Sequence, residues 1–162
     1  MTDTNENAPK PFDMAAAMAR YHADRAAYER RSESVHPANK KALFDALASA
    51  NITQVIVTFD GYGDSGQIED ISALCGGDTV ALPKGEITIA RVIWGNDEIT
   101  ENTMSVEEAV EQLAYDFLSE THGGWENNDG AYGEFTFDVE EETITLDYNE
   151  RYTATETYEH TF

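Results

Sequence analysis

Two glycine-rich stretches carry the side chains best suited to chemistry: FDGYGDSGQIED at 59–70 and HGGWENNDGAYGEF at 122–135. Both hold hard oxygen donors between glycines, the ligand type that calcium takes about six to eight at a time. Neither has the spacing of an EF-hand loop, which needs oxygen ligands at loop positions three and five. Counted from Asp60, position three is Tyr62, and counted from Asn127, position five is Ala131. Two interpretations remain open: a non-standard calcium site shared by both loops, or ordinary tight turns, which commonly use Asp-Gly and Asn-Asp-Gly.

Other reactive side chains give weaker signals. Cys75 with His122 and Asn127 or Asp129 has the residue types of a thiol hydrolase. Those types occur in most chains of this size, and a cysteine at the end of an apolar strand is typical of a buried structural thiol. The histidines are too scattered for zinc, and GYGDSG lacks the lysine of a phosphate loop. We therefore predict no catalytic residue, no metal and no cofactor.

Three aromatic residues lie among these glycines and acids, at Tyr62, Trp125 and Tyr132. Their rings can fold back onto a core and hold the loops in place. They can also act as anchors of a contact surface, since Trp and Tyr dominate binding hot spots. The sequence leaves both roles open.

The negative charge of the chain is concentrated in its later part. The 162 residues include 32 Asp and Glu against 10 Lys and Arg, for a formal net charge of −22. Residues 1–50 hold seven of each sign, whereas residues 51–162 hold 25 acidic and three basic side chains. Direct binding to nucleic acid or to an anionic membrane needs Lys and Arg, so neither is predicted. The lack of a membrane span or an apolar signal segment leads us to expect a cytoplasmic protein.

The first third of the chain favours helices. Residues 1–12 are polar with two prolines, which predicts a mobile tail. Asp13 can cap a helix that runs to about Ser34. Pro37 disfavours helix in the residue before it, so we expect a second, separate helix over about 38–50.

After Ile52 the apolar pattern changes to the alternation of strands. Seven strand-like segments follow, at about 51–60, 67–74, 79–83, 85–94, 132–139, 143–152 and 155–162. The last three alternate apolar residues with Thr and acids, which indicates an antiparallel meander with one face in the core. Between the expected strands at 85–94 and 132–139, Ser105 and Glu108 form a capping box for an amphipathic helix that ends near Thr121.

These elements predict a single α+β domain over 13–162, with a helical segment at 13–50 and an acidic sheet-plus-helix core at 51–162. An antiparallel sheet of about five to seven strands should carry the amphipathic helix on one face, and two further helices should form the N-terminal segment. The expected core includes Val110, Leu113, Phe117, Phe137, Ile144 and Leu146.

Long motifs in this chain resemble a known family. FDGYGDSGQIED, LAYDFLSETHGGWENNDGAYGEFTFD and TITLDYNERYTATETYEHTF are similar to segments of small acidic proteobacterial proteins, a family catalogued as a domain of unknown function. The resemblance covers roughly residues 38–162. It implies no activity, cofactor or catalytic residue. It does suggest a plasmid or mobile-element setting, where acidic proteins that block host defence systems are common.

Two functions from different classes remain open. The leading hypothesis is a non-enzymatic protein whose acidic surface engages a basic, nucleic-acid-binding partner, as an inhibitor of a CRISPR or restriction complex would. The alternative is a small enzyme or ligand-binding domain with a pocket between the 60–66 and 123–131 loops, where Tyr62, His122 and Trp125 would converge. Salt adaptation also favours acids, but the neutrality of residues 1–50 counts against it.

The residues expected to bind the partner are acids on the helix and strands together with loop residues. They are Tyr62, Asp64, Glu107, Glu108, Glu111, Trp125, Glu126, Asp129, Asp138 and Asp147.

Overall fold

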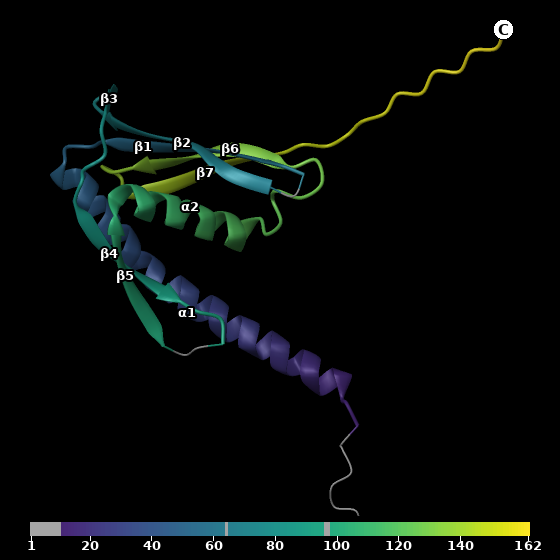
Figure 1. The fold of residues 1–162 in the computed structure, drawn as a ribbon, viewed down its shortest axis with the longest axis horizontal. Coiled ribbons are helices and arrows are strands. Elements are labelled where there is room, and N and C mark those ends of the chain that lie inside the picture. The colour runs from purple at the N-terminus through teal and green to yellow at the C-terminus, as the bar shows by residue number, and fades with distance from the viewer. Residues whose placement is uncertain (1–10, 64, 96–97) are drawn as a thin grey trace, which may run out of the picture.

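The structure, a computed structural model, describes residues 11–63, 65–95 and 98–162. Its elements are α1 (Met14–Ser49), β1 (Gln54–Tyr62), β2 (Ser65–Cys75), β3 (Asp78–Val80), β4 (Glu86–Val92), β5 (Ile99–Ser105), α2 (Val106–Thr121), β6 (Ala131–Asp138) and β7 (Thr143–Glu150). The α+β class is as predicted. Figure 1 shows α2 lying along one face of the main sheet, while α1 extends away below it beside β4 and β5.

The main sheet has five antiparallel strands in the order β3-β2-β1-β6-β7. Side chains alternate between its faces, and in β1 this places Val55, Val57 and Phe59 in the core. Phe135 and Phe137 of β6 pair with Val57 and Val55 and are also buried. The face that holds these five residues packs against α2, so the apolar alternation of each strand fixes which face α2 covers.

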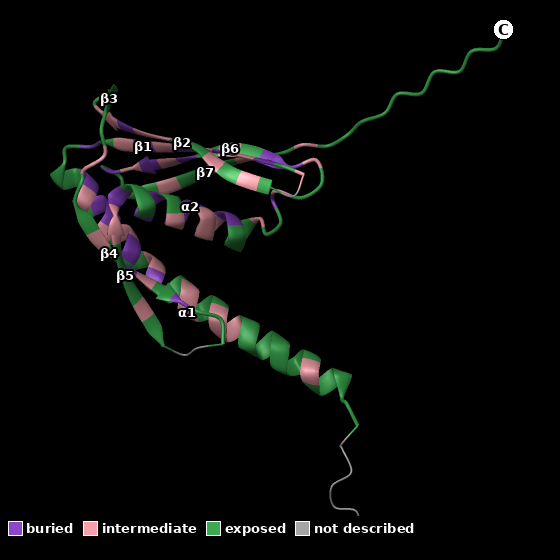
Figure 2. Ribbon diagram, in the orientation of Figure 1, coloured by how far each residue is buried: buried purple, intermediate pink, exposed green. Residues whose placement is uncertain are grey.

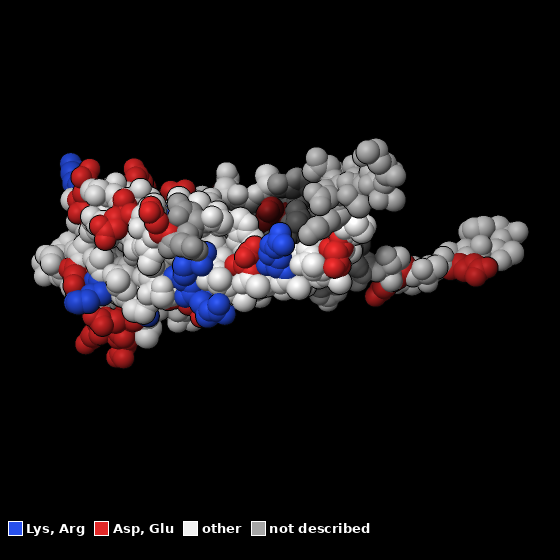
Figure 3. All heavy atoms as spheres, turned by 90° about the horizontal axis from the view of Figure 1, so that it is seen from below, with Lys and Arg blue, Asp and Glu red and all other residues white. Residues whose placement is uncertain are grey.

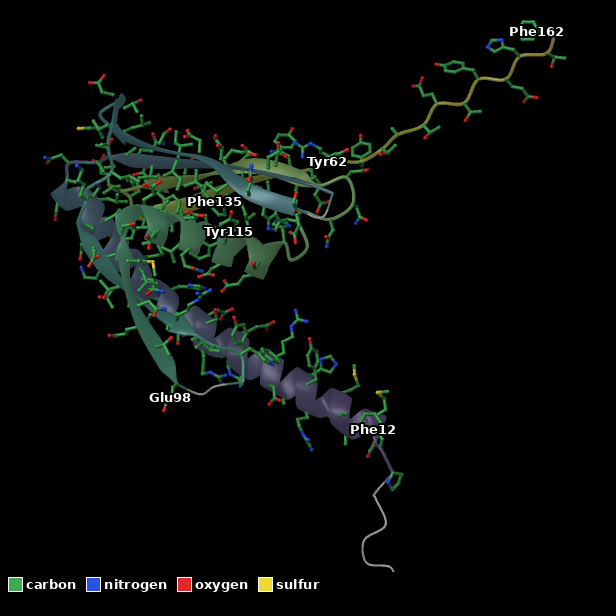
Figure 4. The ribbon with its side chains drawn as sticks, in the orientation of Figure 1. Phe12, Tyr62, Glu98, Tyr115, Phe135 and Phe162 are labelled. Carbon is green, nitrogen blue, oxygen red and sulfur yellow. The ribbon has the colours of Figure 1, made fainter. Side chains whose placement is uncertain are left out.

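Helix α2 begins where the capping box predicts. The Ser105 hydroxyl accepts a hydrogen bond from the Glu108 amide at 3.1 Å, and the buried side chains of α2 face the sheet. Tyr115 reaches from α2 to β2, where its hydroxyl accepts a hydrogen bond from the Ile68 amide at 3.0 Å. Figure 4 shows Tyr115 and Phe135 between helix and sheet. The register between β1 and β2 shifts after Thr58, next to Ile68. The Tyr115 hydroxyl thus gives the Ile68 amide a hydrogen-bond acceptor where the regular strand pairing is interrupted.

The expectation of two N-terminal helices is wrong, because α1 is one helix that continues through Pro37. A proline inside a helix removes a hydrogen bond and costs about 3 kcal/mol. Tertiary contacts hold the helix on both sides of it. His36 Nε2 lies 2.9 Å from a carboxylate oxygen of Glu120, and Asn39 is almost fully buried with two hydrogen bonds to the backbone of Ala90.

Strands β4 and β5 form a separate two-stranded sheet that packs along α1. The sequence indicated β4 but not β5. Figure 2 shows buried residues on the C-terminal half of α1 and exposed residues over most of its N-terminal half. The buried residues of the helix all lie in its second half, from Val35 to Leu47.

The expected strand at 155–162 is wrong. Residues 151–162 form no helix or strand, and they extend away from the end of β7 with nearly all their side chains in solvent. Figure 1 shows this segment leaving the body of the molecule. Ile144, Leu146 and Phe117, which were expected in the core, are half-buried against its edge.

Candidate functional site

The face of the main sheet opposite α2 is acidic, and no element among the described residues covers it. Cross-strand register places Thr58 of β1 between Asp70 of β2 and Glu134 of β6. Glu134 is in turn paired with Asp147 of β7. Neighbouring strands lie about 4.8 Å apart, so one straight row across four strands carries three exposed carboxylates within about 15 Å.

Hydrogen bonds from neighbouring side chains orient two of these carboxylates without adding positive charge. The Ser72 hydroxyl donates to Asp70 at 2.8 Å, and the Asn149 amide donates to Asp147 at 2.9 Å. Asp138 lies at the end of β6 on the same face, where its carboxylate accepts a hydrogen bond from a turn amide. The face therefore keeps its negative charge exposed and ordered.

Arg151 is the cation at the edge of this face. Its guanidinium forms an ion pair with Asp60 at 2.9 Å, donates to the Gly61 carbonyl at 3.1 Å, and lies 4.6 Å from the centre of the Tyr132 ring. Its amide donates to the Gly130 carbonyl at 3.0 Å. Arg151 thus joins β1, the loop before β6 and the end of β7. Its charge is offset by Asp60 rather than left available to a ligand.

The two glycine-rich stretches meet around the Trp125 ring, which is 8% exposed and packs edge-on against Phe59. A Cβ on Gly61 would lie 2.5 Å from the Trp125 ring, and a Cβ on Gly66 would overlap the same ring. Only glycine leaves room for the indole at both positions. The Trp125 ring therefore anchors the loop to the sheet. Of the two roles that the sequence allowed, it packs on the core rather than projecting from a contact surface.

The residues of the proposed loop pocket do not converge. The His122 ring stacks on Tyr148 with centroids 3.6 Å apart, Trp125 is buried, and Tyr62 is 77% exposed. A small hollow of about 270 Å³ next to Tyr62 is lined by residues 60–69 alone. Cys75 lies at the other end of β2, more than about 20 Å along the strand, so the thiol-hydrolase set does not come together either.

The remaining predicted residues lie in three places. Glu107, Glu108 and Glu111 are exposed on the surface of α2 that faces away from the sheet, so they are separate from the Asp138 and Asp147 face. Glu126 and Asp129 are half-buried in the loop after α2, and Asp129 accepts a hydrogen bond from Thr153 at 2.9 Å. Asp64 lies outside the described residues. Sequence reasoning missed Asp70 and Glu134.

The model of a family of unknown function, DUF6878, matches residues 35–162. The chain belongs to this family. No curated protein and no solved structure matches it. The DUF6878 segment contains the whole main sheet, α2, the β4–β5 hairpin and the residues after β7, but only the C-terminal part of α1. Over the described ranges, no helix is long and apolar enough to cross a membrane, and no group of three or more His, Cys, Asp or Glu is placed to hold a metal ion.

A cleft of about 450 Å³ lies between α1, β4 and α2, partly outside the DUF6878 segment. One wall is aromatic: the Trp94 ring packs edge-on against Tyr28 at 5.2 Å and lies 6.0 Å from Tyr21. Sequence patterns give no sign of this cleft, because its walls come from elements that are far apart in the chain. Figure 3 views the molecule from below and shows Lys and Arg interspersed with Asp and Glu on that side.

The polar wall of the cleft is a hydrogen-bonded group from α1 and α2. Glu120 accepts a hydrogen bond from the Ser32 hydroxyl at 2.8 Å and contacts His36 Nε2 at 2.9 Å. Asp116 accepts from the Gln112 amide at 2.9 Å, and burial raises the pKa of its carboxyl above the ordinary value. The wall is thus rich in acceptors.

Proposed function

We propose that this protein is a non-enzymatic binding protein whose uncovered sheet face engages a basic partner that itself binds nucleic acid. The observation that carries the proposal is the row formed by Asp70, Glu134 and Asp147 across four strands, which lies opposite the α2-covered face. An uncovered sheet face presents such charges to a partner without a pocket.

The acids of this face form a negative strip that a phosphate-binding surface would contact. Adjacent strands lie about 4.8 Å apart, and side chains on one face of a strand repeat about every 6.6 Å. Glu134 and Asp147 are therefore one strand apart, Asp70 lies two strands from Glu134, and Asp138 lies about 13 Å along β6 from Glu134. Inhibition of a CRISPR or restriction complex is the concrete form that we propose.

Charge reversal on two faces tests the proposal. In the first variant Asp70, Glu134 and Asp147 become Lys. In the matched control Glu107, Glu108 and Glu111 on α2 become Lys, which changes the net charge by the same amount on the other side of the molecule. Exposed substitutions usually change stability by less than about 0.5 kcal/mol. Glu107 and Glu108 lie in the first turn of α2, where Lys costs about 0.3–1 kcal/mol more at each position, so the melting temperature of each variant is measured first to show that it folds.

The assay is capture from a bacterial lysate followed by displacement with duplex DNA. The unmodified chain should retain proteins that DNA then releases, and retention should fall as salt rises past about 0.15 M, where exposed charges are screened beyond about 8 Å. The sheet-face variant should lose this retention and the α2 variant should keep it. Equal retention by both variants, or capture that DNA does not displace, contradicts the proposal.

A second candidate function is binding of an organic cation in the cleft. Aromatic faces attract cations, and three rings, at Tyr21, Tyr28 and Trp94, line the same cleft as Asp116 and Glu120. Arg25 and Arg91 line it too, and Arg25 is paired with Glu29 at 3.0 Å. Calorimetric titration with arginine, spermidine and tetramethylammonium tests it. Trp94→Leu should abolish any binding, and since Trp94 is about half exposed the fold should persist. Binding that is unchanged in this variant would place the cation elsewhere.

A further inference from the structure

The C-terminal arm, which we define as residues 151–162, is extended and makes no strand pairing within the described chain. It continues from β7 into solvent, as Figure 1 shows, and Figure 4 shows Phe162 at its tip, far from the body. Three large rings on it are open to water, with exposed fractions of 85% for Tyr152, 76% for Tyr158 and 115% for Phe162. A free chain gains nothing by holding such rings in solvent.

The composition of the arm suits a β-strand with two different faces. Threonine and aromatic residues favour strands because they fit a pleated, half-buried surface. Even-numbered positions carry the aromatic side, with Tyr152, Tyr158, His160 and Phe162. Odd-numbered positions carry the threonine side, with Thr153, Thr155, Thr157 and Thr161.

The outer edge of β7 is the matching acceptor. It is the last strand of the sheet, and among the described residues no strand pairs with its outer side. On the α2 side of the sheet, Ile144, Leu146 and Tyr148 of β7 are only half-buried, whereas Phe135 and Phe137 of the adjacent β6 are buried. The apolar layer is therefore incomplete along this edge.

We propose that the arm of one copy pairs antiparallel with the β7 edge of a second copy, and that the second copy returns its arm to the first. A two-fold axis passes between the Tyr152 residues of the two copies. In this register, arm residues 154–161 lie opposite all eight residues of β7, 143–150. Such a reciprocal exchange is an isologous contact that closes at two copies.

This register places compatible side chains opposite each other. Directly opposed residues of an antiparallel pair point to the same face. On the α2 side, Tyr158 lies opposite Leu146, so the ring covers the half-buried edge of the core. On the other side, Asp147 lies opposite Thr157 and Thr145 lies opposite Glu159, so no like charges are opposed there.

The contact is large enough for a stable pair. Each aromatic ring buries about 150–250 Å², so Tyr158 of each arm on β7 and the two Tyr152 rings at the axis supply about 600–1000 Å². Stable interfaces bury about 1200–2000 Å², which the arm backbone and threonines would complete. Because the axis of an antiparallel pair is perpendicular to the sheet, both acidic faces would point the same way. The pair would then present one acidic surface twice as long.

Light scattering on the full-length chain across a concentration series tests the pairing. We expect a mass of twice the 18.0 kDa of one chain, and higher salt should favour the pair because two acidic molecules repel each other. The test variant is Thr157→Pro with Tyr158→Pro. Successive residues direct their amides to opposite sides, so one of the two prolines must remove a pairing donor.

The matched control, Thr157→Val with Tyr158→Phe, keeps strand preference and the ring. We expect the proline variant to raise the dissociation constant at least tenfold and the control to leave it near that of the unmodified chain. The described arm beyond Thr153 makes no hydrogen bond to the body, so neither variant should change the melting temperature of the dilute single chain. A chain that stays single at every concentration and salt overturns the proposal.

Engineered cysteines distinguish exchange between copies from a hairpin within one chain. In a Cys75→Ser background, Thr145→Cys with Glu159→Cys should form a covalent pair of chains on oxidation. Thr145→Cys with His160→Cys points the thiols to opposite faces and should not. A cross-link inside a single chain would show that the arm folds back on its own β7, which contradicts the exchange. The covalent link forms in the purified chain with no partner protein present, so the two proposals fail separately.

Discussion

Gly66→Ala tests whether the glycine-rich loops exist to seat Trp125. Gly66 of β2 pairs with Gly61 of β1, and both face the indole ring. The backbone of Gly66 is not in the left-handed region, so alanine meets no backbone strain there. Its Cβ would lie 2.7 Å from Cζ3 of Trp125 and 2.9 Å from Cβ of Glu126. Carbon atoms at rest lie about 3.5–4.0 Å apart, so the ring would have to move.

The cost follows from how tightly the ring is held. Gly61 on one side and Phe59, with its ring centre 5.4 Å away, on another leave little space for a shift. Overpacking of this kind costs about 1–3 kcal/mol. In a Trp125→Leu background the clash with the ring is gone, and Glu126, 2.9 Å away, lies in a loop that the indole no longer holds in place. Alanine should then be neutral or favourable by about 0.5–1 kcal/mol, because glycine is a poor strand residue. The two sites should therefore couple by roughly 1.5–4 kcal/mol, well above the ~0.5 kcal/mol of independent sites.

The double-mutant cycle compares the unmodified chain, Gly66→Ala, Trp125→Leu and the double variant. Their free energies of unfolding are measured in urea by far-ultraviolet circular dichroism, because two of the four proteins lack Trp125 and cannot be compared by tryptophan fluorescence. Gly85→Ala is the control, because nothing lies within 4 Å of a Cβ there. Each kcal/mol should also shift the melting temperature by about 2–4 °C. If Gly66→Ala were as mild as Gly85→Ala, or cost the same with and without Trp125, the anchoring argument would be refuted.

Three further outcomes are expected. Asn39→Ala should destabilise the protein by about 2–4 kcal/mol in urea, because both backbone groups of Ala90 lose their partner. Burial raises the pKa of Asp116 in the folded state above the ordinary value of 3.8, so stability is lost as pH rises from 3.8 through the raised value. Asp116→Asn should therefore be neutral below pH 3.8, raise the melting temperature increasingly between the two pKa values, and give a constant gain above the raised one. Calcium should raise the melting temperature no more than sodium at equal ionic strength, whereas a bound ligand at 100 times its dissociation constant would add about 2.7 kcal/mol.

The elements that carry their own local signals were predictable. The capping residues and apolar spacing of α2 indicate its start, end and buried face, and the alternation of β1, β2, β6 and β7 indicates two hairpins. These patterns involve only neighbours in the chain. Pro37 shows their limit, because its effect on α1 is overridden by contacts with Glu120 and Ala90, which are distant in the sequence.

The acidic site was only partly predictable for a related reason. Asp138 and Asp147 stand out as acids on an alternating strand, but the row with Asp70 depends on the cross-strand register. The shift after Thr58 determines which acid of β2 faces Glu134, and turn length and packing set that shift rather than composition. The strand predicted at 155–162 was wrong because the threonines and aromatic residues of this segment express only a local preference. Strand pairing depends on a second strand, and among the described residues none pairs with this segment.

Charge is segregated in this molecule, and that segregation separates the two proposed interactions. Of the nine Lys and Arg in the described ranges, six lie on α1, and Arg151 at the sheet face is paired with Asp60. The sheet face can therefore attract a basic partner while α1 does not, which a uniformly salt-adapted surface would not achieve. Partner binding joins opposite charges and should weaken with salt, whereas arm exchange joins two acidic copies and should strengthen. If partner binding and arm exchange both weakened, or both strengthened, as salt rises, one of the two contacts would not use the surface proposed for it.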